Sequence, residues 1–292
     1  MPLLEKGQWR ADLNSLAEMD NFPTQITAES HRYHFYYAYG CPFAHRANLV
    51  IHYLDLHHEI SSSSTAPEML DQGWTFNKQY PDSLFHSAFL RDIYLKAKPD
   101  YSGRVSLPVL WDKHAQTIAC NDSAEMALHL ATEWQDFVKN PATLVPEALK
   151  EEISRLNEWL NQQITLKVYQ VGLANSQQKY EKQLAKLFEN LETLDDRLAQ
   201  TRYLFGETIT LSDFFLFPTL IRFESVYADL YKCNLKPLSE FKHLYRYMID
   251  LYQQPAIQAT VDIPYTKRFY YFSQPHLNPT RLVPVGPNLK WR

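Results

Sequence analysis

Two kinds of hydrophobic pattern divide the chain, and the first predicts a small α/β domain. Residues 32–38 are rich in aromatic side chains and predict a strand that ends at Gly40. The apolar positions of residues 42–56 recur at the spacing of a helix. Further strands are predicted at 58–63, 107–112 and 117–120, and a further helix at 123–132. The order is β-α-β, then two adjacent strands and a helix.

A long segment interrupts this pattern. Residues 64–106 separate the second predicted strand from the third, and this is too long for a routine connection. The segment carries several large aromatic side chains: Trp74, Phe76, Tyr80, Phe85 and Phe89. We therefore expect an ordered insertion and not a linker.

The second kind of pattern is helical and begins after Pro141 and Pro146. Residues 147–168 and 177–200 keep a 3.6-residue periodicity over long stretches. A further helix is predicted at 238–253, and the proline-rich segment 262–292 shows no periodicity, so we expect it to wrap over the surface.

Thr210-Leu-Ser-Asp213 has the spacing of a capping box, in which the two side chains satisfy backbone N–H groups at a helix start. The helix that it begins contains Pro218, which should kink it. The patterns together predict an α/β domain over 1–135, with an N-terminal extension and the insertion 64–106, followed by an all-α domain over 136–292.

Composition excludes several classes of function. The chain has 292 residues, 45% of them hydrophobic and 21% charged, as in ordinary globular proteins of two domains. A net charge of −4 and the lack of a Lys/Arg block argue against binding to nucleic acid or to an anionic membrane. The longest apolar run is too short for a transmembrane helix, and we expect no secretory signal.

The three cysteines, Cys41, Cys120 and Cys233, are far apart, which favours reduced thiols and a cytoplasmic location. Cys120 and Cys233 lie among apolar residues and are expected in the core. The eleven histidines match no metal-binding motif, so we expect no metal site. His45, in the first turn of the predicted helix, is expected to point outward.

Cys41 is the strongest candidate for chemistry. It follows a predicted strand and directly precedes a helix, where unpaired N–H groups and the helix dipole favour thiolate over thiol. Pro42 suits the first helical turn, and Arg46 could add positive potential. Because Ala44 stands where a dithiol centre would have a second cysteine, an outside thiol must resolve any disulfide. The alternative is a cysteine that only packs as a small buried side chain.

Two further motifs suit a thiol site. Pro108 opens a strand directly after a loop, which makes the Leu107–Pro108 bond a plausible cis site. Asp122 and Ser123 begin a helix, where they could hold a carboxylate or serve simply as an N-cap.

These motifs, in this order, carry a specific resemblance. YGCPFAHRA, LPVLWD and NDSAEM, followed by the TLSD capping box, resemble a cytosolic glutathione transferase of the cysteine type. Further phrases, GWTF, YSGRVSLPVLWDK, VYQVGLA, RFESVY and YKCN, resemble the Xi class, the glutathionyl-hydroquinone reductases. The resemblance implies an N-terminal thioredoxin-like domain, a C-terminal helical domain and a homodimer.

The resemblance also implies roles for individual residues. Cys41 would be the nucleophile. Glutathione would be held by Trp74, Arg104, the backbone of Leu107, Asp122 and Ser123. Three tyrosines match those around the family's quinol pocket: Tyr169, Tyr227 and Tyr270.

Two positions depart from the family pattern. Phe43 stands where the family usually has Trp, and Asp122 where it usually has Glu. We expect Phe43 to alter the shape of the substrate pocket while keeping an aromatic wall. Asp122 is shorter by one methylene, which affects affinity for glutathione more than mechanism.

Three hypotheses for function follow. The first is reductive removal of glutathione from glutathionyl-hydroquinones. The second keeps the fold and Cys41 but acts as an Omega-like thioltransferase or dehydroascorbate reductase, which does not require the tyrosines. The third is a non-catalytic binding module, for which an activated thiol has no use.

Overall fold

The structure, a computed structural model, describes residues 3–12, 15–289 and 291. The chain divides into two units, Met1–Pro141 and Ala142–Arg292, and each is described by itself. No helix in the described ranges is both long enough and apolar enough to cross a membrane.

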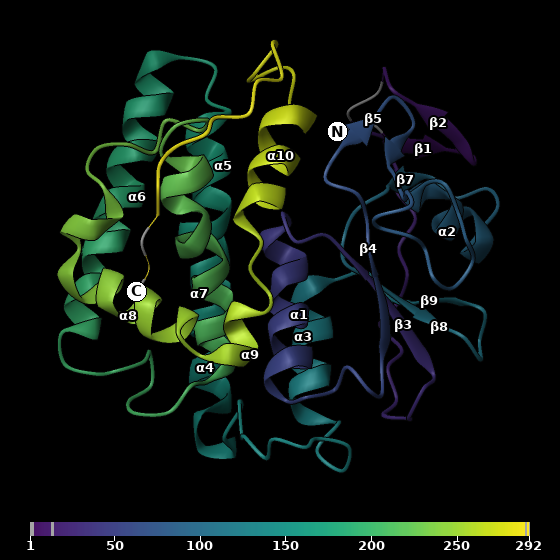
Figure 1. The fold of residues 1–292 in the computed structure, drawn as a ribbon, viewed down its shortest axis with the longest axis horizontal. Helices are drawn as coiled ribbons and strands as arrows, with labels where there is room; N and C mark the ends of the chain where they lie inside the picture. The colour runs from purple at the N-terminus through teal and green to yellow at the C-terminus, as the bar shows by residue number, and fades with distance from the viewer. Residues whose placement is uncertain (1–2, 13–14, 290, 292) are drawn as a thin grey trace. The chain divides into compact units, whose positions relative to one another are not determined.

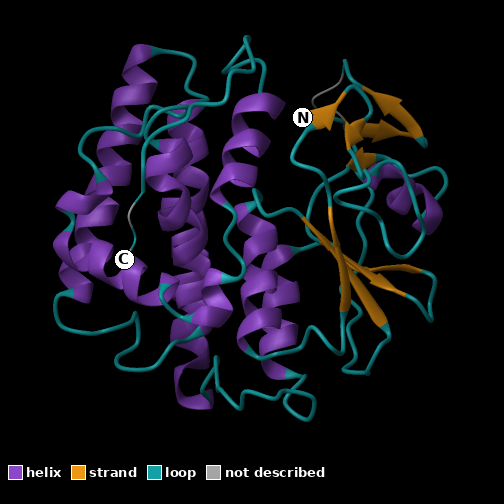
Figure 2. Ribbon diagram, viewed as in Figure 1, coloured by secondary structure: helices purple, strands orange, loops and turns teal. Residues whose placement is uncertain are grey.

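A four-stranded mixed sheet is the centre of the first unit (Figure 2). Its strands lie in the order β4-β3-β8-β9, with β3 parallel to β4 and antiparallel to β8. The strands are β3 (Tyr33–Tyr37), β4 (Ser61–Ser64), β8 (Val109–Asp112) and β9 (Thr117–Cys120). All five residues of β3 are buried, as expected for a central strand covered on both faces.

Two helices pack against each other on one face of this sheet (Figure 1). They are α1 (Pro42–Tyr53) and α3 (Ser123–Thr132). The helix predicted over 42–56 is thus confirmed, although it ends at Tyr53. The strand predicted at 58–63 is shifted to Ser61–Ser64, because Leu56 and Ile60 are buried in a turn closed by the bond from Ile60 N–H to the Leu56 carbonyl.

The insertion 64–106 is ordered. It contains β5 (Met69–Leu70), β6 (Gly73–Trp74), α2 (Leu90–Ala97) and β7 (Gly103–Arg104). Strand β7 joins the N-terminal strands in a separate sheet of order β2-β1-β7. These two strands are β1 (Leu3–Glu5) and β2 (Gln8–Arg10). The N-terminal extension is therefore tied to the insertion by backbone hydrogen bonds.

Helices make up the second unit. The α-helices are α4 (Lys150–Leu160), α5 (Leu166–Gly172), α6 (Gln177–Leu198), α7 (Leu211–Arg222), α8 (Lys242–Tyr252), α9 (Pro255–Gln258) and α10 (Ile263–Ser273). Two π-helical segments, Asn161–Thr165 and Phe223–Tyr227, and two short 3₁₀ segments, Glu147–Leu149 and Leu238–Glu240, complete the set. The helix predicted over 147–168 is interrupted by the first π-helical segment, a feature that often lies near functional sites.

The capping box at Thr210 is confirmed and is buried. One carboxylate oxygen of Asp213 accepts the Thr210 N–H at 2.7 Å, and the other accepts the Leu204 N–H at 3.1 Å and the Tyr247 hydroxyl at 2.8 Å. Burial raises the pKa of Asp213 despite these donors. Asp213 thus ties the start of α7 to a preceding loop and to α8.

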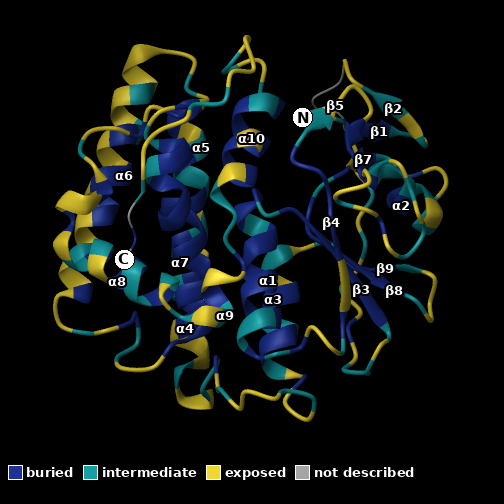
Figure 3. Ribbon diagram, viewed as in Figure 1, coloured by how far each residue is buried: buried dark blue, intermediate teal, exposed yellow. Residues whose placement is uncertain are grey.

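The prediction that 262–292 lacks helical structure is wrong for its first part. Asp262 accepts the Tyr265 N–H at 2.8 Å and caps α10, a helix that includes buried residues (Figure 3). Tyr265, Phe269 and Tyr270 are among them. The density of aromatic side chains hid the helical spacing in the sequence. Beyond α10 the chain returns to it, since Lys267 Nζ donates to the carbonyls of Val285 and Gly286 at 3.0 and 2.8 Å.

Candidate active site

Cys41 is the N-cap of α1, with its backbone extended and its sulfur at the helix start. The Ala44 N–H donates to Sγ at 3.4 Å. A sulfur that accepts a first-turn N–H at the positive end of a helix is favoured in its anionic form. The side chain is largely buried, with 9% of its surface exposed, so the sulfur is shielded from bulk water.

A cis peptide bond joins Leu107 to Pro108, as the sequence suggests. The Leu107 carbonyl oxygen lies 3.6 Å from Cys41 Sγ, within the longer range of a sulfur hydrogen bond. The loop before β8 and the start of α1 therefore meet at the sulfur. Leu107 presents backbone atoms beside it, where an extended peptide-like ligand can pair.

Arg46 connects α1, the helix that Cys41 caps, to Ser123 at the start of α3. Its guanidinium carbon lies 5.1 Å from the centre of the Phe43 ring, in cation–π geometry. Its Nη1 donates to Ser123 Oγ at 3.4 Å. Because Arg46 is almost fully buried, its charge acts within the first unit with little screening by solvent. The positive potential expected from Arg46 is thus placed between α1 and the start of α3.

Asp122 serves as the N-cap of α3. Its Oδ1 accepts the N–H groups of Ala124 and Glu125 at 2.8 and 2.9 Å. Both cap bonds use Oδ1, which leaves Oδ2 outside the cap. Asp122 is therefore an N-cap, and a ligand bound to this side chain would contact Oδ2.

Trp74 and Arg104 come from the insertion. Trp74 is buried in β6, paired with Met69 of β5, and Arg104 is exposed in β7 beside β1. Their assignment to glutathione stays a prediction.

His45 contradicts the sequence prediction, because only 3% of it is exposed. Almost all of α1 is buried, so its first turn has no outward face for an imidazole. Cys120 and Cys233 are both buried, as predicted.

Three predicted tyrosines of the second unit meet at their hydroxyls. Tyr270 Oη lies 2.7 Å from Tyr169 Oη and 2.9 Å from Tyr227 Oη. Tyr169 follows the first π-helical segment by one turn, Tyr227 ends the second, and Tyr270 lies on α10. The three hydroxyl groups carry three protons for these two contacts, and each contact uses one proton, so the third proton points away from both contacts. Burial, followed by the other tyrosines, raises the pKa of Tyr270 well above its usual value, so this phenol stays protonated at neutral pH.

A fourth tyrosine, Tyr231, was missed in the sequence analysis. Its ring lies edge-on to the other three, with centroids 5.3, 5.7 and 5.9 Å from those of Tyr169, Tyr227 and Tyr270. Its hydroxyl donates to Gln274 Oε1 at 2.7 Å. The spacing of Tyr227 and Tyr231 by four residues is the signal that could have indicated a shared side.

Comparisons with known proteins identify the family of this chain. Residues 40–133 match the glutathione S-transferase N-terminal domain, and residues 177–249 match the C-terminal domain. Glutathionyl-hydroquinone reductase YqjG of Escherichia coli is 39% identical over 89% of this chain and 80% of its own length. Glutathionyl-hydroquinone reductase PcpF of Sphingobium chlorophenolicum is 35% identical over 89% of this chain and 84% of its own length.

Solved structures show the same fold. The Xi-class glutathione transferase of Natrialba magadii has a TM-score of 0.96 at 34% identity, over 100% of this chain and 94% of its own. The glutathione-bound structure of YqjG has a TM-score of 0.91 at 37% identity, over 99% of this chain and 96% of its own. The chain belongs to the Xi-class glutathionyl-hydroquinone reductases of the glutathione transferase superfamily.

Proposed function

We propose that this protein removes glutathione from glutathionyl-hydroquinones through a mixed disulfide at Cys41. The observation that carries the proposal is the lone thiol at the start of α1, held beside the Leu107 carbonyl with Ala44 in place of a second cysteine. Such a thiol can attack a sulfur atom and form a mixed disulfide, but an external thiol is needed to reduce that disulfide and restore Cys41. Glutathione supplies that thiol.

Two displacements complete the reaction. The Cys41 thiolate attacks the sulfur of the glutathionyl-hydroquinone, a Cys41–glutathione disulfide forms, and the bond between sulfur and the ring carbon breaks. The ring carbon takes a proton, which releases the free hydroquinone. The thiolate of a second glutathione then attacks the mixed disulfide, and glutathione disulfide leaves with Cys41 restored.

Glutathione is assigned to the surroundings of Cys41 within the first unit. The Leu107 backbone pairs with the cysteinyl part of the tripeptide, and Asp122 Oδ2 and Ser123 bind its γ-glutamyl end. Arg46 helps through its contact with Ser123, since its buried charge favours the γ-glutamyl carboxylate. Trp74 and Arg104 hold the remaining part, and Phe43 forms a wall of the substrate pocket.

The tyrosine cluster is assigned to the quinol. Tyr169, Tyr227 and Tyr270 are phenols that donate hydrogen bonds to the quinol oxygens, and these bonds stabilise the charge that develops as the carbon–sulfur bond breaks. Disulfide exchange has no such requirement. The cluster therefore favours the quinol substrate over the Omega-like thioltransferase or dehydroascorbate reductase activity.

The family resemblance also supports a homodimer and a cytoplasmic location. Size-exclusion chromatography with light scattering measures the first, and an elution mass of one chain would contradict it. Cys41, Cys120 and Cys233 form no disulfide, which is consistent with a reducing compartment.

The test follows release of menadiol from glutathionyl-menadiol in the presence of glutathione. In a separate sample without free glutathione, the protein is exposed to glutathionyl-menadiol and examined by mass spectrometry, so that the mixed disulfide is not resolved. The wild-type chain should carry one glutathione on Cys41. Cys41→Ser should abolish both the adduct and the turnover, whereas Cys120→Ser, which changes a buried thiol with no assigned role in the reaction, should retain both. Turnover by Cys41→Ser at the wild-type rate would refute the proposal.

A further inference from the structure

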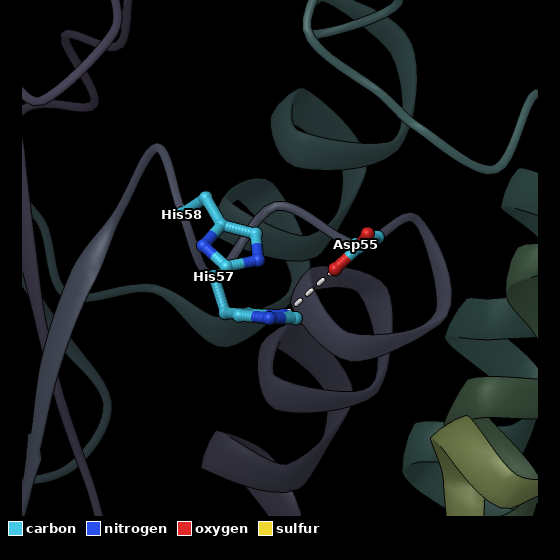
Figure 4. A group of neighbouring side chains, drawn as sticks. All are labelled: Asp55, His57 and His58. Carbon is cyan, nitrogen blue, oxygen red and sulfur yellow. Dashed lines mark ion pairs between the residues drawn. The ribbon is translucent and has the colours of Figure 1, made fainter.

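The turn that follows α1 brings two imidazoles and a carboxylate together on the surface. One possible ligand atom from each of Asp55, His57 and His58 lies within 4.8 Å of the other two (Figure 4). His57 Nδ1 is 3.0 Å from Asp55 Oδ1, and the rings of His57 and His58 are 4.2 Å apart between centroids. The function proposed above uses none of these three residues.

The backbone that carries these side chains is firmly held. Asp55 has a φ of 57° in the left-handed region, and its N–H donates to the His52 carbonyl at 3.2 Å. The neighbouring Leu54 and Leu56 are fully buried and fix the turn to the core of the first unit. The donors are therefore close before any ion arrives, so little backbone conformational entropy is lost on binding.

The chemistry of the donors selects the ion. Two neutral imidazoles and one carboxylate suit a borderline dication such as Zn²⁺, whereas Mg²⁺ and Ca²⁺ prefer oxygen donors. Around a tetrahedral Zn²⁺ with bonds of about 2.1 Å, the donors lie about 3.4 Å apart. The donor atoms lie within 4.8 Å of one another before binding, and His57 and His58 are exposed, so their side chains have room to rotate. The C-terminal end of α1 also favours a cation.

We propose that Asp55, His57 and His58 form a surface site for Zn²⁺, with the fourth position open to water. His52, one turn earlier, brings a third imidazole near, with its centroid 6.0 Å from that of His57. The sequence motifs that indicate zinc place their ligands on one helix or on paired loops. Here a left-handed residue turns the chain so that positions 55, 57 and 58 converge.

Cobalt(II) substitutes for zinc in the test because it reports its ligands by absorption. The full chain carrying Cys41→Ser is titrated with Co²⁺, so that the active-site thiolate cannot bind it. We expect d–d bands that saturate at one equivalent, no sulfur-to-cobalt charge-transfer band, and loss of the bands on addition of Zn²⁺. Absence of a saturable signal would overturn the proposal.

Variants then locate the site. His57→Ala, His58→Ala and Asp55→Asn, in the same background, should each weaken binding by at least about tenfold. Asn tolerates the left-handed backbone of position 55, so that variant removes charge without strain. His114→Ala is the matched control, since His114 is exposed beside the single carboxylate of Glu29. Equal weakening in the control, or none in the three variants, would show scattered binding to surface histidines and refute the site.

Discussion

Gly172 makes room for the ring of Tyr231, and replacing it should disturb the tyrosine cluster. A Cβ at position 172 would lie 2.0 Å from Tyr231 Cδ1, 2.6 Å from Cγ and 2.7 Å from Cβ. Ordinary carbon contacts are about 3.5–4.0 Å, so the ring must move by about 1.5 Å or more. Cβ is fixed to the backbone, so a change of rotamer moves Cδ1 and Cγ but leaves the contact with Cβ.

The expected cost of Gly172→Ala is about 1–3 kcal/mol in the free energy of unfolding, the range for overpacked cores. The gain in helix propensity is small, because Gly172 is the last residue of α5. Urea unfolding, followed by far-UV circular dichroism, measures the change. Quinol turnover should also fall, because Tyr231 lies against the three tyrosines assigned to the quinol.

Two further variants make this prediction decisive. Gly286→Ala is the control, since a Cβ there would meet no described atom within 4 Å. In a Tyr231→Gly background all three clashing atoms are gone, so Gly172→Ala should lose most of its cost and the two substitutions should be strongly non-additive. A Gly172→Ala protein as stable as the wild type, or additive costs in the double variant, would refute the reasoning.

Three more predictions test separate parts of the molecule. Tyr270→Phe removes the hydroxyl that contacts both Tyr169 and Tyr227, and it should lower quinol turnover about 100-fold while leaving reduction of a small disulfide intact. Tyr271→Phe is the control, because the Tyr271 hydroxyl donates to Asp229 instead. Equal losses of quinol turnover in the two variants would contradict the assignment. Burial lowers the pKa of His34 to about 4, so as the pH falls the unfolded chain takes up a proton near pH 6.5 and the folded chain only near pH 4. The wild type should therefore lose about 1–2 kcal/mol of stability between pH 7 and pH 5 relative to His34→Gln, and parallel pH profiles in urea unfolding would be the contrary result. Asp213→Ala should lower the free energy of unfolding by about 2–4 kcal/mol, because it leaves the buried Leu204 N–H and Tyr247 hydroxyl unpaired. Asp262→Ala, which removes a simple helix cap, should lower it by about 1 kcal/mol. Similar losses for the two variants in thermal unfolding would argue against the buried network.

Local sequence determined the elements whose signals lie within a few residues. The helix after Cys41 and the capping box at Thr210 could be read directly, because a proline or a paired hydroxyl and carboxylate fixes a helix start by local bonds. The cysteine at the helix start was predictable for the same reason. Leu107, which lies beside its sulfur, and Ser123, which contacts Arg46, were indicated only by their motifs and by the family resemblance.

Tertiary structure decided what depends on packing between distant segments. The burial of His45, the helix over Ile263–Ser273 and the contact of Tyr231 with three other rings follow from surfaces that only the folded units supply. Asp55, His57 and His58 are close in sequence, yet only the left-handed backbone at Asp55 makes them converge. Sequence alone thus specified the thiol and where its helix begins, because those signals are local. The tyrosine contacts and the histidine turn required the fold, because side chains meet only after the backbone has brought their segments together.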